Sequence, residues 1–217
     1  IQNGVKKIVL IDNDKVDISN LHRQFGYSEN DIGKYKVDAM EGRLRAFSND
    51  VEVEKFKMFI DYKNLECLKA NEINLIINCA DQPSVDVTSL WVGEYCMKNN
   101  IPHIIGGGYN LHISLMGQTI IPFKSACVKC FEIGFMEKNN IDTSNLKKMT
   151  VKNRKIGSFG PMCSMIASMT AMEGIKVLSG KISPSNLNRR GEFSIYSMDI
   201  NYQVFDKQSS CEWCGSN

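Results

Sequence analysis

The chain has 217 residues, which is enough length for one domain with a sizeable core. Its net charge of +2 argues neither for nor against a nucleic-acid partner, but no basic run is longer than two or three residues, so we expect none. No apolar segment reaches the roughly 20 residues of a membrane-spanning helix, and the first residues do not resemble a secretory leader, so we expect no membrane partner. Eight cysteines in a chain of this length favour a cytoplasmic protein with a metal site over a disulfide-rich secreted scaffold.

The sequence opens with an apolar strand that ends on an acid. Residues 8–11, Ile-Val-Leu-Ile, are apolar on both faces, as is typical of a parallel strand covered by helices on both sides. Asp12 follows at the carboxyl end, where doubly wound folds bind ligands and an acid can hold ribose hydroxyls. The glycine-rich phosphate-binding turn belongs roughly 20 residues earlier, before Ile1. We therefore expect one domain over residues 1–217 that lacks its first βα unit, in a chain that is a fragment or a processed product.

Alternating helix and strand patterns follow the opening strand. They predict a helix over 31–47, a strand over 51–60, a short helix over 64–70, a strand over 73–79, a helix over 85–99, and strands over 103–105 and 111–121. This order indicates an α/β fold, a Rossmann-like doubly wound sheet with a mixed, partly antiparallel extension. Asp81 follows the second buried strand and is expected at the same sheet edge as Asp12.

The second half of the chain contains a long polar stretch and an apolar helix. Residues 132–158 are too many for an ordinary loop, so we expect a functional crossover or partial disorder there. A helix is predicted from Gly160-Pro161 to Leu178, with Gly180 ending it. Because this helix is rich in methionine and isoleucine, we expect it to be nearly buried. Late strands are predicted over 193–198 and 202–205.

Four of the cysteines form two C-x-x-C pairs, Cys127/Cys130 and Cys211/Cys214. Each pair can place two thiolates on one metal ion, and together they supply a closed, tetrahedral zinc site of the structural kind. The alternatives are a redox pair in each motif, or thiols without a function. Redox pairs usually stand at the start of a helix after a strand, and neither motif is predicted to be placed that way.

The other cysteines are isolated in apolar segments. We interpret Cys67, Cys79, Cys96 and Cys163 as buried small apolar residues. Cys163 could act as a nucleophile, but its helix offers no obvious base.

Charged residues near the predicted sheet edge suggest a nucleotide. Arg23 ends the opening loop and Lys36 lies at the start of the next helix. Together with Asp12 and Asp81 they would suit a nucleoside triphosphate, with the cations on the phosphates, one acid on ribose and one on magnesium. Any one of them alone is more simply a solvated surface charge, and the shared sheet edge is what favours the joint interpretation.

Several motifs in one order resemble a known family. They are Leu10-Ile-Asp-x-Asp, Ser19-Asn-Leu-x-Arg-Gln24, Gly33-Lys-x-Lys36, Asn78-Cys-Ala-Asp81, the two C-x-x-C pairs, and the helix from Gly160-Pro161 to Glu173-x-Ile-Lys176. The chain resembles, over essentially its whole length, the ubiquitin-activating-like adenylyltransferases of the ThiF/MoeB/HesA superfamily. Within that superfamily it is most similar to the microcin-C-type peptide adenylyltransferase, on Gly108-Tyr109, Asn153-Arg154 and Leu187-Asn-x-Arg190 as well.

The resemblance implies a role for each matching residue. Asp12 would hold the ribose; Ser19, Asn20 and Arg23 would line the ATP site; Lys36 would bind the α- and β-phosphates; and Asp81 would hold magnesium. The implied reaction is attack of a C-terminal carboxylate on the α-phosphate of ATP, giving an acyl-adenylate and pyrophosphate. The family acts as homodimers, in which the glycine loop and an arginine from the partner subunit complete the site.

The sequence departs from the family in two ways. The glycine-rich loop is not present in residues 1–217, and no cysteine lies between Cys130 and Cys163 to accept the acyl group as a thioester. We therefore expect the adenylate to leave or to react directly with its acceptor.

Three functions remain open from the sequence. The first is adenylation of a short peptide in peptide-antibiotic maturation. The second is activation of a ubiquitin-like sulfur carrier, of the ThiS or MoaD type, for thiamine or molybdopterin synthesis. The third is a catalytically silent partner subunit that binds a carrier or peptide.

Overall fold

The computed structural model describes residues 1–110, 113–138 and 158–215. Its strands are β1 Lys7–Ile11, β2 Glu52–Phe56, β3 Ile76–Asn78, β4 His103–Ile105, β5 Tyr109–Asn110, β6 Ile113–Met116, β7 Thr119–Ile120, β8 Arg189–Ser194 and β9 Asp199–Val204. Its α-helices are α1 Lys36–Phe47, α2 Val85–Lys98, α3 Val128–Lys138 and α4 Gly160–Ser179. Short 3-10 turns span Ile18–Asn20, Glu29–Asp31, Asn64–Cys67 and Ala70–Glu72.

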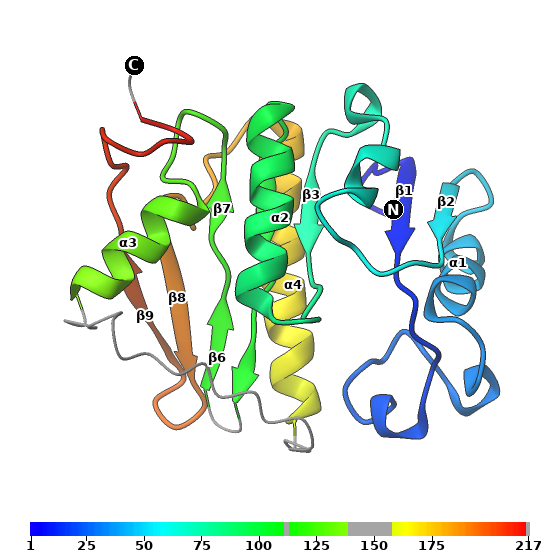
Figure 1. Ribbon diagram of the computed structural model, residues 1–217. Helices are drawn as coiled ribbons and strands as arrows, with labels where there is room; N and C mark the ends of the chain where they lie inside the picture. The colour runs from blue at the N-terminus through cyan, green and yellow to red at the C-terminus, as the bar shows by residue number, and fades with distance from the viewer. Residues whose placement is uncertain (111–112, 139–157, 216–217) are drawn as a thin grey trace.

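The strands form three sheets that stand side by side (Figure 1). Strands β1 and β2 pair in parallel, β3 and β4 also pair in parallel, and β7 joins β4 antiparallel. The third sheet, in the order β5-β6-β8-β9, is antiparallel throughout. Helices α2 and α3 lie on one face and α4 on the other (Figure 1). The predicted α/β fold with a mixed, partly antiparallel extension is confirmed.

One helix covers both parallel sheets. Val92 and Cys96 of α2 are buried in a cluster that also contains Val9 and Ile11 of β1 and Ile76 of β3. The burial of these apolar side chains is the main favourable contribution to packing here, because each fully buried aliphatic side chain contributes about 1.5–3 kcal/mol. A single helix therefore holds the β1–β2 sheet and the β3–β4–β7 sheet in one layer.

Strands β1 and β3 each keep one open edge within the described residues. The N–H of Asp12 bonds to β2, and the carbonyl of Asn78 bonds to the residue that follows β4. Alternate residues of a parallel ladder bond to the same neighbour. The backbone groups of Val9, Ile11 and Ile77 therefore point to the other edge of their strands, where no described strand pairs with them.

The predicted helix over 31–47 begins later than expected. Residues Glu29–Asp31 form a 3-10 turn, and α1 starts only at Lys36. The reason is a short antiparallel clip: the N–H of Val16 donates to the carbonyl of Lys34, and the N–H of Gly33 donates to the carbonyl of Val16. Gly33 has a φ of +85°, a left-handed conformation that glycine adopts freely and that interrupts a helix.

The prediction of a polar loop over 132–158 is wrong for residues 132–138, which are helical. Helix α3 occupies Val128–Lys138, and Phe131 and Phe135 stack on its inner side with ring centroids 6.3 Å apart. Charged residues on the outer side hide this apolar stripe in the sequence. Cys127 stands directly before α3, so the expectation that neither C-x-x-C motif lies at a helix start is also wrong. The rest of the predicted loop, 139–157, lies outside the described residues.

Helix α4 was placed correctly but is less buried than expected. It ends where Gly180 adopts a φ of 62°, as predicted. Met172 is 54% exposed and Leu178 is 43% exposed, so the expectation of near-complete burial is wrong. Periodicity cannot show how many sides of an apolar helix are covered by neighbours. None of the helices that the structure describes is long and apolar enough to span a bilayer.

Other boundaries differ by a few residues. Strand β2 ends at Phe56 rather than at residue 60, β3 covers only Ile76–Asn78, and the short helix over 64–70 is replaced by two 3-10 turns. The late strands lie at Arg189–Ser194 and Asp199–Val204.

Candidate nucleotide site and cysteine cluster

Lys36 stands at the carboxyl end of β1, held by two aspartates. It is the first residue of α1, and its N–H donates to the carbonyl of Asp14 at 2.9 Å. Its Nζ lies 2.7 Å from Oδ2 of Asp14 and 3.9 Å from Oδ2 of Asp12. The side chain of Lys36 is only 12% exposed. A largely buried ammonium group between two carboxylates at this edge of the sheet is suited to binding a phosphate.

Asp12 is fixed in place by its own loop. The N–H of Asp14 donates to Oδ1 of Asp12 at 2.7 Å. Burial raises the pKa of Asp12, against the lowering effects of that hydrogen bond and of Lys36, and the charges of Asp14 and Asp81 raise it further. Asp81 is therefore close enough to act on Asp12 electrostatically. The structure thus brings Asp12 and Lys36 together, with Asp81 near enough for its charge to raise the pKa of Asp12.

Two residues at this place were not among the predicted ones. Asp14 is the closest partner of Lys36, and Tyr27 lies near the same carboxylates. Burial raises the pKa of Tyr27 to about 12, and the charges of Asp12 and Asp14 add to that effect. The spacing of Asp12 and Asp14, two residues apart after a strand, is a signal that could have identified Asp14. Nothing in the sequence distinguishes Tyr27.

The other predicted residues form a self-contained loop. The N–H of Ser19 donates to Oδ1 of Asp17 at 2.8 Å, and Oδ1 of Asn20 accepts from the N–H of Asp17 at 3.0 Å. Nη1 of Arg23 donates to the carbonyl of Ser19 at 2.8 Å. No hydrogen bond or ion pair within the described residues joins Arg23 to Asp12, Asp14 or Asp81. Nε of Arg23 is buried and has no hydrogen-bond partner within the described residues, so the guanidinium keeps N–H groups that its bond to Ser19 does not use.

This loop packs against the start of α4. A Cβ on Gly160 would lie 2.3 Å from the carbonyl oxygen of His22, so only glycine allows this approach. Cys163 lies in the same first turn of α4, where burial raises the pKa of its thiol and the charge of Arg23 partly opposes the rise. A thiol with a raised pKa is a poor nucleophile at neutral pH. Of the four cysteines interpreted as buried, Cys96 is buried and Cys163 is partly buried, but Cys67 and Cys79 are exposed, so the interpretation is wrong for these two.

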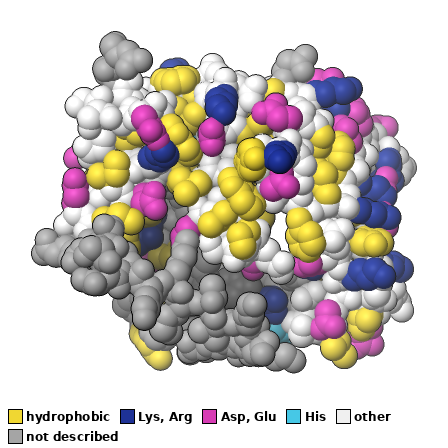
Figure 2. Space-filling view, viewed as in Figure 1, with side chains coloured by type: hydrophobic (Ala, Val, Ile, Leu, Met, Phe, Trp, Pro, Cys, Tyr) yellow, Lys and Arg dark blue, Asp and Glu magenta, His cyan; other side chains and the backbone are white. Residues whose placement is uncertain are grey.

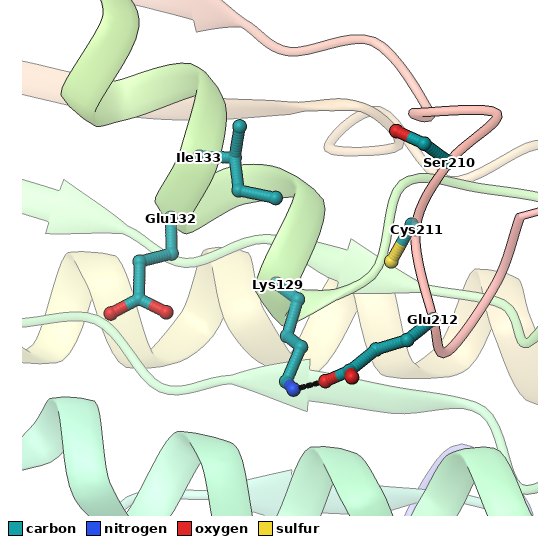
Figure 3. A pocket seen from close by; sticks show the side chains of 6 residues that line it. All are labelled: Lys129, Glu132, Ile133, Ser210, Cys211 and Glu212. Carbon is teal, nitrogen blue, oxygen red and sulfur yellow. Dashed lines mark ion pairs between the residues drawn. The ribbon is translucent and has the colours of Figure 1, made fainter.

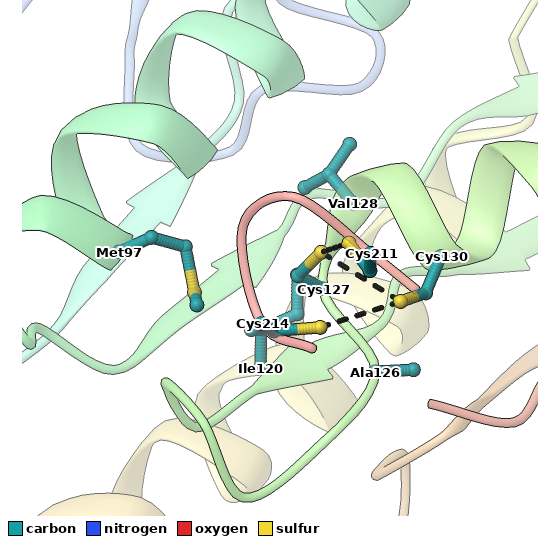
Figure 4. Packing of buried hydrophobic residues seen from close by; sticks show 8 residues of the cluster. All are labelled: Met97, Ile120, Ala126, Cys127, Val128, Cys130, Cys211 and Cys214. Carbon is teal, nitrogen blue, oxygen red and sulfur yellow. Dashed lines mark hydrogen bonds between the residues drawn. The ribbon is translucent and has the colours of Figure 1, made fainter. Parts of the chain in front are cut away.

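The two C-x-x-C pairs meet in a buried cluster (Figure 4). The Sγ atoms lie 3.9 Å apart for Cys127 and Cys130, 3.5 Å for Cys127 and Cys211, and 3.3 Å for Cys130 and Cys214. All four Sγ atoms lie within 4.8 Å of one another. Tetrahedral zinc with bonds of about 2.3 Å requires sulfur separations of about 3.8 Å, so the cluster fits this ion.

Backbone donors surround the cluster, as is usual around metal-bound thiolates. The N–H of Gln208 donates to Sγ of Cys130 at 3.3 Å. Burial would raise the pKa of Cys211, but N–H groups of Trp213 and Cys214 and the neighbouring thiols outweigh it and lower the pKa to about 7. Four buried ligands leave no open position, so the fit is to a structural ion and not a catalytic one.

A shallow cavity of about 350 Å³ lies beside the cysteine cluster. Its lining residues are Lys129, Glu132, Ile133, Ser210, Cys211 and Glu212 (Figure 3). Lys129 and Glu212 form an ion pair across it. The cavity contains none of the groups gathered around Lys36, so it does not form part of the candidate nucleotide site.

Comparisons with known proteins give a consistent result. A model of the ThiF family matches residues 1–214. The adenylyltransferase and sulfurtransferase UBA4 of Lodderomyces elongisporus is 26% identical over 98% of this chain and 44% of its own length. The sulfur carrier protein ThiS adenylyltransferase of Escherichia coli is 25% identical over 99% of this chain and 78% of its own length. The chain thus spans less than half of the UBA4 relative.

Solved structures resemble the chain over nearly its whole length. The crystal structure of E. coli MccB with MccA-N7isoASN matches with a TM-score of 0.82 and 26% identity, over 98% of this chain and 61% of that one. The structure of E. coli MccB with ATP matches with a TM-score of 0.79 and 28% identity, over 98% of this chain and 60% of that one.

Proposed function

The chain belongs to the ThiF family, and from this premise we propose that it uses ATP to adenylate the C-terminal carboxylate of a peptide or small carrier protein. The observation that carries the proposal is the position of Lys36 between Asp12 and Asp14 at the carboxyl end of β1, with Asp81 nearby. The names of the relatives, which are adenylyltransferases, support the same reaction.

The proposed reaction needs charge neutralisation more than proton transfer. A carboxylate oxygen attacks the α-phosphorus of ATP, the bond from that phosphorus to the bridging α–β oxygen breaks, and pyrophosphate leaves with the electron pair. The carboxylate is already ionised at neutral pH, so no general base is required. Catalysis then consists of positioning the reactants and stabilising charge on the phosphates.

Each site residue has a proposed part in that reaction. Lys36 neutralises the α- and β-phosphates, Asp12 accepts hydrogen bonds from the ribose hydroxyls, and Asp81 holds magnesium. Ser19, Asn20 and Arg23 line the ATP site, with Arg23 on the phosphates. Carboxylate ligands suit magnesium, which binds ATP through its phosphates.

Two substrate classes have equal support. Likeness to MccB, whose solved complexes include MccA, favours a short peptide, as in microcin-C-like biosynthesis. Likeness to the ThiS adenylyltransferase and the molybdopterin-synthase adenylyltransferase of E. coli favours a small sulfur carrier. In either case we propose that the adenylate is released or passed directly to its acceptor, because no cysteine lies between Cys130 and Cys163.

A pyrophosphate-exchange assay separates these substrates. The full-length protein is incubated with ATP, magnesium and labelled pyrophosphate, and with either a carrier ending in Gly-Gly or a short peptide ending in Asn. Exchange that depends on one of the two identifies the class. Absence of exchange with both, and of ATP binding by calorimetry, would contradict the proposal and favour a silent partner subunit.

We also propose that the protein acts as a homodimer in the cytoplasm. Met172 and Leu178 of α4 are exposed apolar side chains that no other described element covers, which supports a contact with a second copy. A reducing compartment would keep the cluster thiols available for zinc. Sedimentation velocity should give a dimer that Met172→Asp dissociates and Met198→Asp, at an exposed position in the turn between β8 and β9, does not. A wild-type monomer at all concentrations would contradict the dimer.

A further inference from the structure

We infer that Asp14 is a positioning residue, which holds Lys36 in the place where it meets the phosphates of ATP. The inference rests on the proposed function, since it gives Asp14 a task only if Lys36 binds a nucleotide. None of the roles proposed above involves Asp14. It nevertheless makes the shortest contact of any group with Lys36, 2.7 Å from Oδ2 to Nζ.

The backbone places Asp14 opposite Lys36. The carbonyl of Asp14 accepts the N–H of Lys36 at 2.9 Å, and Lys15 forms an isolated antiparallel bridge with Tyr35. The N–H of Val16 donates to the residue before Tyr35, also at 2.9 Å. These contacts form one antiparallel clip between residues 14–16 and 33–36. The clip fixes the pairing register of these two segments, so the backbone places the side chains of Asp14 and Lys36 next to each other.

The side-chain contact selects one orientation of Lys36. Its Nζ is 2.7 Å from Asp14 but 3.9 Å from Asp12, so Asp14 is the primary partner and Asp12 the secondary one. A lysine side chain has four rotatable bonds, and fixing them only when the ligand arrives would reduce affinity. Because the pair forms before the ligand binds, Lys36 is already ordered at the sheet edge.

Removing the charge of Asp14 should redirect Lys36. Asp12 would be the remaining carboxylate in reach, and a closer pair with Asp12 would occupy the group proposed to hold the ribose. Both effects weaken the interaction with ATP. Neither effect changes binding of the carboxylate substrate. In the proposed site Asp14 contacts only Lys36, and Lys36 contacts the two aspartates and the phosphates.

The test compares three variants of the full-length protein in the pyrophosphate-exchange assay. In Asp14→Asn we expect the KM for ATP to rise about tenfold, because a displaced ammonium group binds the phosphates less well, and kcat to fall as well, because Lys36 also stabilises charge in the transition state. The KM for the acyl substrate should stay unchanged. Asp14→Glu keeps the charge and should restore most of the affinity for ATP.

Asp38→Asn is the matched control. Asp38 lies two residues after Lys36 in α1, and its carboxylate pairs with Lys55 and with Lys57, each at 2.7 Å, so it tests the loss of lysine–aspartate pairing that does not involve Lys36. This variant should keep the wild-type KM for ATP. Melting temperatures of all variants show whether any change in KM follows a loss of fold.

Three results would overturn the inference. One is a KM for ATP in Asp14→Asn within twofold of the wild type, another is an equal rise in Asp38→Asn, and the third is a parallel rise in both KM values together with a lower melting temperature. These outcomes are distinct from failure of the proposed function, in which the wild-type protein itself neither exchanges pyrophosphate nor binds ATP.

Discussion

At the scale of single residues, Lys36 has the most constrained environment among the proposed site residues. It is 12% exposed, it begins α1, and two aspartates lie within 4 Å of its Nζ. Lys34, two residues earlier, pairs with Asp31 at 3.0 Å but is 56% exposed. The contrast separates a lysine that is held in one place by two carboxylates from one that contributes a surface ion pair of about 0–1 kcal/mol.

Replacing Lys36 by alanine should remove activity and leave the fold intact. We expect kcat/KM for ATP in the exchange assay to fall about 100-fold or more, the usual cost of losing one group that stabilises developing charge. The melting temperature should change little, because both aspartates can reach water.

Lys34→Ala is the control for that substitution, since it removes a charge from the same loop. It should leave exchange near the wild-type level. If Lys36→Ala kept wild-type activity, the assignment of the nucleotide site would be wrong.

At the scale of elements, a buried carboxylate ties α4 to the rest of the fold. Glu173 is 5% exposed and accepts hydrogen bonds from the N–H of Ser185 at 3.0 Å, the N–H of Asn186 at 2.9 Å and the hydroxyl of Thr119 at 3.2 Å. Nζ of Lys176 lies 2.7 Å away. One side chain therefore joins the end of α4, the following turn and β7.

Removing this carboxylate should destabilise the protein. Glu173→Ala leaves several buried donors without a partner, so we expect the free energy of unfolding to fall by about 3 kcal/mol. Urea denaturation measures the change. Glu94→Ala, which breaks an exposed pair with Lys98 of the same 2.7 Å length, should change it by less than about 1 kcal/mol.

The contribution of Glu173 should depend on pH in a defined direction. Burial alone would raise its pKa, but the hydrogen bonds from Lys176, Ser185 and Asn186 outweigh burial, and the pKa lies below its usual value. The stabilisation is therefore complete above the unfolded pKa of about 4.3 and disappears as the pH falls through the lower folded value. The difference in unfolding free energy between wild type and Glu173→Gln should be constant from about pH 7 to 5 and shrink below about pH 4. If this difference in unfolding free energy grew as the pH was lowered, the pKa of Glu173 would be raised rather than lowered by folding, against our expectation.

At the scale of the whole molecule, the cysteine cluster joins two distant parts of the chain. Cys127 and Cys211 are 84 residues apart in sequence and 3.5 Å apart between their Sγ atoms. The cluster holds the start of α3 against the C-terminal segment, in a buried group with Met97 of α2 and Ile120 of β7.

Loss of zinc should therefore loosen the whole domain. We expect one zinc ion per chain by elemental analysis, and a fall of about 10 °C or more in the melting temperature after chelation or in Cys211→Ser. Cys67→Ser, at an exposed cysteine outside the cluster, is the control. Equal melting curves with and without chelator would contradict a structural ion.

Within the described residues β1 and β3 each keep an open edge, and we propose that the expected first βα unit supplies a parallel strand between them. Hydrogen exchange tests this. The amides of Val9, Ile11 and Ile77 should exchange quickly in the 217-residue chain and slowly in a longer natural form, while those of Ile8 and Leu10, which face β2, should be protected in both. Slow exchange of the Val9 and Ile11 amides in the 217-residue chain would contradict the proposal.

The arrangement of charged side chains on the surface adds information that the net charge does not contain. On the face drawn in Figure 2, basic side chains gather at the edge formed by β2 and α1, with acidic side chains among them. Lys55 pairs there with both Asp38 and Glu41. Lys57 pairs with the other carboxylate oxygen of Asp38, so both of these lysines have acidic neighbours.

The errors in the predicted elements have local physical causes. The start of α1 was missed because the clip between Val16 and Lys34 is a contact across a loop, which no helical period reports. Helix α3 was missed because the apolar stripe on its inner side consists of only three residues, Val128, Phe131 and Phe135. The burial of α4 was overestimated because apolar composition does not reveal how many neighbours a helix has.

The sequence by itself determined the apolar strand that ends on Asp12, the glycine that ends α4, and the pairing of Cys127/Cys130 with Cys211/Cys214. These follow from short-range periodicity, backbone conformation and ligand spacing. Only the tertiary structure decided that Asp14 is the nearer carboxylate partner of Lys36, that Arg23 donates to Ser19 within its own loop, and that β1 and β3 keep open edges within the described residues. Those facts depend on which segments, distant in the chain, come to lie side by side, and local spacing does not encode that arrangement.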